Sequence, residues 1–395
     1  MIVPLYLSTT NLTDGNFVTI FRRLAQPSPF RRIYICGFTS NYITALFPEW
    51  HGEEIRLLGN EGVKKPSMKE EPLASATEKD LLIAAYVKAE LCVGGEGALR
   101  FPGKQLYVNN EPGDAIYSFP QDPSLPPPPD FARRSPYGTT QTESIESYLP
   151  PVDRAYVIGH LEDSNRTVRV PIGIQYLLLS MPPSRREKIF NHIHRPKNNG
   201  KHFAIYLAKH CIPFRDTAAK LIAQIGELHI GKEYQKCIDK FPDPPGSKPQ
   251  MSIAPRGDLK IHDSVWMSNE NVFYSYRYAL VMENTYRDGY ISEKLIIAFL
   301  SGSIPIWYGT KEVFEIFNRN AFIYFDVENP EPALQKIREL EADPAAYKEM
   351  LVEPILVNGE RTIEEYFSLE NGIGGGKLKN KIRMMMGLKN GEALE

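Results

Sequence analysis

Four residue types that together suit a charged, hydroxyl-rich ligand occur within one short stretch of the chain. Residues 282–295 read MENTYRDGYISEKL and bring together the amide of Asn284, the phenol of Tyr290, the carboxylate of Glu293 and the ammonium of Lys294. Cationic and N–H donors bind phosphate oxygens, whereas a carboxylate accepts hydrogen bonds from sugar hydroxyls. The stretch therefore suits a sugar linked to a diphosphate. The simpler alternative is a solvated, charge-rich helix cap.

The elements around this stretch must place its side chains at one point. It joins the end of a predicted strand to the start of a predicted helix, where free backbone N–H groups and the positive helix end favour anions. Short β-branched and aromatic runs alternate with helical patterns along the chain, which predicts an α/β protein with parallel sheets. Strands are predicted at residues 32–38, 80–85, 105–111, 155–161, 203–208, 278–284, 304–309 and 322–325, and helices at 184–194, 213–225, 291–300, 311–317 and 330–340.

Two domains are expected, because 395 residues exceed what one core usually serves. A polar linker at residues 195–200 marks the passage between them, and the Pro-rich residues 113–153 read as an insertion. We expect domains at 1–177 and 178–358 and a tail at 359–395. Two parallel sheets joined in this way would leave a ligand cleft between the carboxyl ends of their strands.

Composition excludes some partners. With 46 basic and 48 acidic residues, the chain has no overall field that would recruit nucleic acid. The four cysteines lie far apart, which predicts reduced packing residues. His192 and His194 stand two positions apart on a predicted helix and cannot share a metal, so no metal site is expected. No run of about 20 apolar residues is present, which predicts a soluble chain.

The tail carries cationic residues interleaved with apolar ones from Lys377 to Met386. This pattern fits a basic amphipathic helix on a membrane surface, and it equally fits a solvated, disordered terminus.

The stretch at residues 282–309 resembles the signature of the α-1,3/1,4-fucosyltransferases, glycosyltransferase family ten, and the bacterial members look most similar. That family has a Phe-Glu-Asn-Ser type strand end, a variable loop, Tyr-x-Thr-Glu-Lys, and a strand with a central proline that closes on glycine. The matching segments are MENT at 282–285, YISEK at 290–294 and GSIPIWYG at 302–309. A second segment, YLAKHCIPFRD at 206–216, is similar to the strand and loop that deliver an arginine to the diphosphate.

The resemblance implies an enzyme that transfers L-fucose from GDP-fucose to a hydroxyl of a glycan acceptor, with no cofactor or metal. It implies that Asn284, Tyr290, Glu293 and Lys294 bind the donor and that Arg215 grips the diphosphate. The segment KQLYVNNEP at 104–112 resembles the strand that ends in the catalytic glutamate. Glu111 is accordingly the first candidate for the general base.

Glu96 is the second candidate for this base. The implied fold is the GT-B type, two Rossmann-like domains that face each other, and the implied mechanism is a single displacement with inversion. Two alternatives stay open: a transferase of this fold that uses another nucleotide sugar, and a catalytically silent glycan-binding protein. A bacterial or viral type of enzyme would be cytoplasmic or peripheral to a membrane, whereas a trimmed eukaryotic one would act in the Golgi lumen. The acceptor and the oligomeric state stay open.

Overall fold

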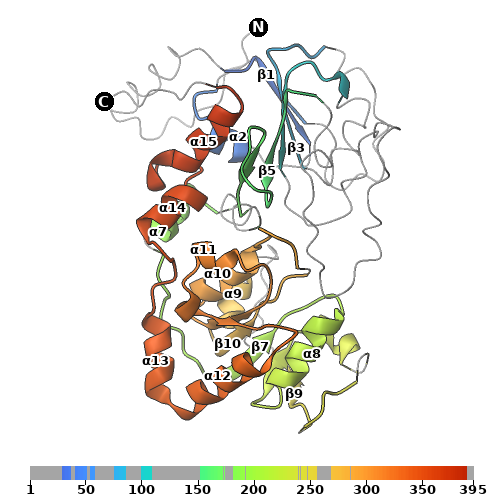
Figure 1. The fold of residues 1–395 in the computed structure, drawn as a ribbon, viewed down its shortest axis with the longest axis vertical. Helices are drawn as coiled ribbons and strands as arrows, with labels where there is room; N and C mark the ends of the chain where they lie inside the picture. The colour runs from blue at the N-terminus through green and yellow to red at the C-terminus, as the bar shows by residue number, and fades with distance from the viewer. Residues whose placement is uncertain are drawn as a thin grey trace.

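The chain folds around two separate parallel sheets. The computed structural model describes residues 29–36, 41–50, 54–57, 75–85, 99–108, 152–171, 173, 181–191, 193–238, 240, 242–246, 248–255, 268–284 and 286–388. Each sheet has six strands in this described part, and every pairing within it is parallel. Figure 1 shows one sheet above the other along the long axis of the molecule. The expected α/β architecture is confirmed.

The first sheet has the strand order β2-β1-β3-β4-β5-β6. Its central strands consist of aliphatic and aromatic runs that are buried on both faces, as parallel strands require. The helix α2 (Asn41–Leu46) packs into the same core. The strands are β1 (Arg32–Cys36), β2 (Glu54–Leu57), β3 (Leu81–Ala85), β4 (Lys104–Val108), β5 (Ala155–Gly159) and β6 (Thr167–Arg169).

The second sheet has the strand order β9-β8-β7-β10-β11-β12. Read from β7, the chain first adds β8 and β9 on one side and then returns to add β10, β11 and β12 on the other. This is the doubly wound order of nucleotide-binding domains, and its switch point lies between β7 and β10. The strands are β7 (His202–Tyr206), β8 (Leu228–Ile230), β9 (Met251–Ile253), β10 (Tyr276–Leu280), β11 (Ile304–Trp307) and β12 (Ile323–Tyr324).

Helices cover both faces of the second sheet. The helix α10 (Glu293–Leu300) runs directly into β11, whose residues are all buried. The helices are α7 (Pro183–Asn191), α8 (Pro213–Ile222), α9 (Ser268–Phe273), α10 (Glu293–Leu300), α11 (Val313–Ile316), α12 (Glu331–Ala342) and α13 (Pro344–Val352), with 3₁₀ turns η5 (Lys232–Cys237) and η6 (Arg319–Ala321).

The end of the chain returns to the first domain. After α14 (Glu360–Tyr366), α15 (Lys377–Met385) lies beside α2 (Figure 1) and also contacts β6. Leu378 and Ile382 of α15 are buried in the core of the first sheet, and Arg383 forms an ion pair with Glu49 at 2.6 Å. The apolar face that suggested membrane contact is therefore packed against protein. None of the helices in the described part of the chain is long and apolar enough to cross a bilayer.

Candidate functional site

The switch point of the second sheet gathers the residues that the sequence singles out. β7 and β10 are neighbours in register, with Tyr206 opposite Leu280. The chain leaves β7 toward Arg215 and leaves β10 toward Asn284. Because parallel strands end at the same edge of a sheet, the two loops meet there, and ligands of doubly wound sheets bind at this position.

Arg215 connects these two loops. It lies in the first turn of α8, where Pro213 starts the helix without losing a hydrogen bond. Its Nε donates to the hydroxyl of Tyr206 at 3.0 Å, and its Nη1 donates to Oδ1 of Asn284 at 2.8 Å. The side chain is buried, whereas Asn284 is exposed at the surface. In the described part of the chain, no group accepts a hydrogen bond from Nη2 of Arg215.

The positive charge of Arg215 is not neutralised by a carboxylate among the described residues. The nearest acid along the chain, Asp216, accepts a hydrogen bond from Tyr234 at 2.6 Å instead. Burial raises the pKa of Asp216, and the Tyr234 bond and the charge of Arg215 oppose this shift. Burial likewise raises the pKa of Tyr206 to about 12, so its hydroxyl stays neutral beside Arg215. An uncompensated guanidinium favours an anionic ligand.

Lys294 stands near the start of α10, held by a buried network. Ser292 caps the helix, because its hydroxyl accepts from the backbone N–H of Lys294. The Lys294 ammonium donates to Oε2 of Glu283 at 3.1 Å and to the Ser292 hydroxyl at 2.9 Å. Glu283 is completely buried and also accepts from the N–H and the hydroxyl of Ser292, both at 2.8 Å. The carboxylate thus receives three donors and fixes the direction of the lysine.

The charge state of Lys294 follows from this network. Burial, the largest single influence, lowers the pKa of Lys294, but the charges of Glu283 and Glu293 and the hydrogen bond to Glu283 together raise the pKa above the ordinary value. Lys294 and Glu283 form a neutral pair, whereas Arg215 has no ion-pair partner among the described residues, and the N-terminus of α10 adds a partial positive charge.

The other two residues that are predicted to bind the sugar donor belong to the same segment. Tyr290 is buried, and its backbone N–H donates to the carbonyl of Arg287 at 3.1 Å. Glu293 is the first residue of α10, partly exposed, and its charge acts on Lys294. Hence Arg215 and Asn284 are in direct contact, and Tyr290, Glu293 and Lys294 occupy the adjoining loop and helix start.

The loop between β10 and α10 lies directly against the first domain. Gly289 has a φ of +69°, and a Cβ there would lie 2.1 Å from the carbonyl oxygen of His160, just after β5. Only glycine fits both the backbone conformation and the contact. A second close approach occurs at Gly309, where a Cβ would lie 2.6 Å from the Trp307 ring and 2.9 Å from Cγ of Glu283. These glycines let the backbone close around the site.

The prediction of reduced cysteines is wrong for one pair. Cys211 and Cys237 form a disulfide with a Cα–Cα distance of 5.3 Å. Cys211 lies just before α8, and Cys237 ends η5. Twenty-six positions separate them along the chain, so sequence spacing gave no sign that the fold brings them together. The disulfide ties the loop that carries Arg215 to the segment after β8.

The two candidates for the general base, Glu111 and Glu96, lie outside the described residues, as does His192. Sequence reasoning assigned no role to Glu283 and Ser292, which hold Lys294. Both stood within the matched motif. The serine directly before Glu-Lys at a predicted helix start is the signal that could have identified a cap. No cluster of three metal-binding side chains occurs in the part of the chain that the structure describes.

Comparison with known proteins finds similarity to one family within the second domain. A family model described as the C-terminal region of glycosyltransferase family 10 (fucosyltransferase) matches residues 255–352. The α-(1,3)-fucosyltransferase of Helicobacter pylori is 38% identical over 89 residues, which are 22% of this chain and 19% of the relative. An α-(1,4)-fucosyltransferase of Arabidopsis thaliana is 27% identical over 161 residues, 40% of this chain and 38% of the relative. These alignments thus span less than half of each curated relative.

A solved structure extends the likeness to both domains. The crystal structure of an α1,3-fucosyltransferase with GDP-fucose superimposes with a TM-score of 0.51 and covers 93% of each chain at 15% identity. At so low an identity, the superposition is evidence about the fold alone. The superposition confirms the expected GT-B type arrangement of two Rossmann-like domains.

Proposed function

We propose that this chain, whose residues 255–352 carry the C-terminal region of glycosyltransferase family 10, is a fucosyltransferase that moves L-fucose from GDP-fucose to a hydroxyl of a glycan. One observation carries the proposal most directly: Arg215 meets Asn284 at the switch point of the second sheet, 2.8 Å apart. An arginine that has no carboxylate partner among the described residues, close to a capped helix start, suits a diphosphate.

In this proposal the diphosphate lies over the start of α10. The Nη2 group of Arg215 and the ammonium of Lys294 donate to phosphate oxygens, and Asn284 orients Arg215 from the opposite loop. Glu293 accepts hydrogen bonds from ribose or fucose hydroxyls, and Tyr290 lines the same end of the site. The matched family model and the motif at residues 290–294 support these roles.

The proposed reaction is a single displacement with inversion. The acceptor oxygen forms a bond to the anomeric carbon of fucose while the bond from that carbon to the β-phosphate oxygen of GDP breaks. Glu111, or else Glu96, takes the proton from the acceptor hydroxyl. Arg215, Lys294 and the helix start stabilise the charge that develops on GDP. Because these groups supply the charge compensation, the proposal includes no metal ion.

The disulfide indicates the kind of cellular compartment in which the chain acts. Cytosolic thiols are kept reduced, whereas disulfides persist in lumenal, periplasmic and extracellular settings. The Cys211–Cys237 bond therefore supports an oxidising compartment over the cytoplasm. This favours the lumenal alternative among the settings that the sequence left open.

A donor panel tests the proposal. Nucleotide release is measured with GDP-fucose, GDP-mannose and UDP-galactose, each with and without a mixture of oligosaccharides that end in galactose or N-acetylglucosamine. We expect GDP release from GDP-fucose that depends on the acceptor, with a mass gain of one deoxyhexose on the glycan. Turnover of UDP-galactose or GDP-mannose alone would assign another donor, and binding without turnover of any donor would assign a silent protein.

A further inference from the structure

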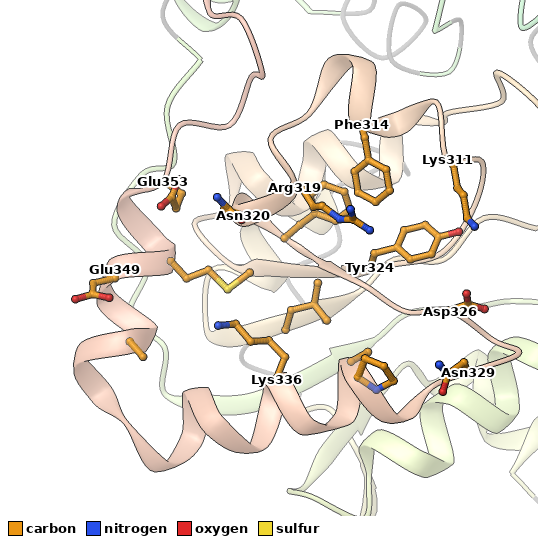
Figure 2. Close-up of a pocket in the computed structure, with 16 residues that line it drawn as sticks. Lys311, Phe314, Arg319, Asn320, Tyr324, Asp326, Asn329, Lys336, Glu349 and Glu353 are labelled. Atoms are coloured by element: carbon orange, nitrogen blue, oxygen red, sulfur yellow. The ribbon is translucent and has the colours of Figure 1, made fainter.

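A cavity of about 510 Å³ opens in the second domain, and none of its lining residues belongs to the proposed donor site. It borders the outermost strand, β12, between η6 and α11 on one side and α12 and α13 on the other (Figure 2). Its volume lies within the range of small-molecule sites, roughly 300 to 1,000 Å³.

Three cations line the cavity from different elements: Lys311, Arg319 and Lys336. Arg319 lies over the ring of Phe314, with its guanidinium carbon 4.7 Å from the ring centroid. Figure 2 shows this guanidinium extending toward the rings of Phe314 and Tyr324. None of the three cations forms an ion pair with a carboxylate in the described part of the chain. The stacking holds the planar Arg319 group in place, while its N–H donors stay available.

Three carboxylates, Asp326, Glu349 and Glu353, also line the cavity. Asp326 accepts the backbone N–H of Glu328 at 3.0 Å, and Glu353 accepts the side-chain amide of Asn318 at 3.1 Å. Glu349 extends outward from α13 in Figure 2. The lining thus holds three cations and three carboxylates, so its preference for an anion depends on where the ligand lies. Arg319 offers donors only, and an acceptor-rich group is favoured against its guanidinium.

The edge of β12 adds backbone groups to the same wall. The N–H of Phe325 donates inward to the carbonyl of Trp307 at 2.8 Å. Neighbouring residues of a strand direct their peptide groups to opposite sides, so the N–H and C=O of Tyr324 point to the open edge that borders the cavity. Apolar surface from Ile323 and Pro332 completes the wall.

We propose that this cavity is a second ligand site, which binds a small oxyanion, a carboxylate or a phosphate, carried on a sugar-sized ring. Arg319 grips the oxyanion through two N–H groups, with Lys311 and Lys336 as further cations. The ring lies against Tyr324 and the apolar wall. The site does not depend on GDP-fucose binding, because it shares no residue with the proposed donor site.

Titration calorimetry on the full chain tests this site with glucuronate, glucose 6-phosphate, inorganic phosphate and glucose. We expect glucuronate, glucose 6-phosphate or both to bind at least tenfold more tightly than glucose, and whichever binds identifies the source of the anion. Arg319→Gln should weaken that binding at least tenfold, since a hydrogen bond to a charged group contributes about 1.5–3 kcal/mol. The matched control Lys348→Gln, an exposed lysine of α13 outside the lining, should leave it unchanged.

The variant Arg215→Gln separates this site from the donor site, because it should leave the anion affinity intact. Circular dichroism melting checks that each variant is folded, and Lys336→Gln provides a second test in the lining. The proposal is overturned if neither sugar anion binds, if glucose binds equally well, or if Arg319→Gln and Lys336→Gln both bind like the wild type. Binding of inorganic phosphate as tight as that of glucose 6-phosphate would overturn the role of the ring.

Discussion

Nη1 of Arg215 lies 2.8 Å from Oδ1 of Asn284, and this contact joins two loops that are 69 positions apart in the sequence. The partner of Arg215 is a neutral amide, whereas the partner of Lys294 is the buried carboxylate of Glu283 at 3.1 Å. Arg215 and Lys294 therefore differ in the charge of their partners. Lys294 is fixed by a counter-ion that the protein supplies, whereas no carboxylate among the described residues neutralises Arg215.

Glu283→Gln should destabilise the second domain. Both oxygens of Glu283 accept hydrogen bonds, so an amide there directs an N–H group at a donor and leaves Lys294 without its counter-ion. Loss of one partner of a buried pair costs about 3–5 kcal/mol. Chemical unfolding of the full chain should show this loss. Glu331→Gln, at an exposed pair with Arg338, should change stability by less than about 0.5 kcal/mol, and an equal effect of both would contradict the account.

Lys294 should stay protonated well above neutral pH. Burial lowers its pKa, Glu283 and Glu293 together raise it more, and the net pKa is higher than the ordinary 10.5. Because the folded-state pKa is raised, its contribution to stability is fully present below pH 10.5 and is lost only as pH rises through the folded pKa. The ratio of GDP affinities of wild type and Lys294→Met should stay constant from about pH 7 to about pH 9. A ratio that falls toward one over this interval would show that Lys294 loses its proton there.

Glu111→Gln should lower turnover by roughly 10²-fold or more and leave GDP-fucose binding nearly unchanged, because a general base acts on the acceptor hydroxyl. Single-turnover rates and donor titration measure the two quantities separately. Glu96→Gln is the matched variant. Full activity of Glu111→Gln together with inactivity of Glu96→Gln would transfer the role to Glu96.

Loss of the Cys211–Cys237 disulfide should affect both stability and donor binding. A bond of this kind typically stabilises by about 2–4 kcal/mol. Cys211 also fixes the residues just before α8, so the double variant Cys211→Ser/Cys237→Ser should bind GDP about tenfold more weakly at a temperature where it is folded. Wild type with the bond reduced serves as the comparison. Unchanged GDP affinity in both would show that the disulfide does not position Arg215.

Most of the regular framework could be predicted from hydrophobic patterning. All eight expected strands and five expected helices occur, with ends that shift by a few residues. The missed strands β2, β6, β8 and β9 have only three or four residues, too few for a clear periodicity. The return of α15 to the first domain depends on contacts such as Arg383 with Glu49, and no local pattern encodes such contacts.

The candidate site divides in a similar way. Asn284, Tyr290, Glu293 and Lys294 lie within one stretch whose composition already suits an anionic sugar ligand, so they could be found from the sequence. Only the tertiary structure shows that the buried carboxylate of Glu283 holds this stretch in place. In the sequence, Glu283 cannot be distinguished from any other acidic residue near a strand end. The Cys211–Cys237 pairing was missed for the same reason, since it depends on η5 folding back toward α8.

Calorimetric titration with GDP and with guanosine tests the central claim most directly, in wild type, in Arg215→Gln and in the exposed control Arg338→Gln. If Arg215 grips the diphosphate, Arg215→Gln should weaken GDP binding by roughly 10- to 150-fold and guanosine binding by less than about twofold, while Arg338→Gln changes neither. Equal GDP affinity of Arg215→Gln and wild type, or an equal loss of guanosine binding, would contradict the assignment of this site to a nucleotide diphosphate.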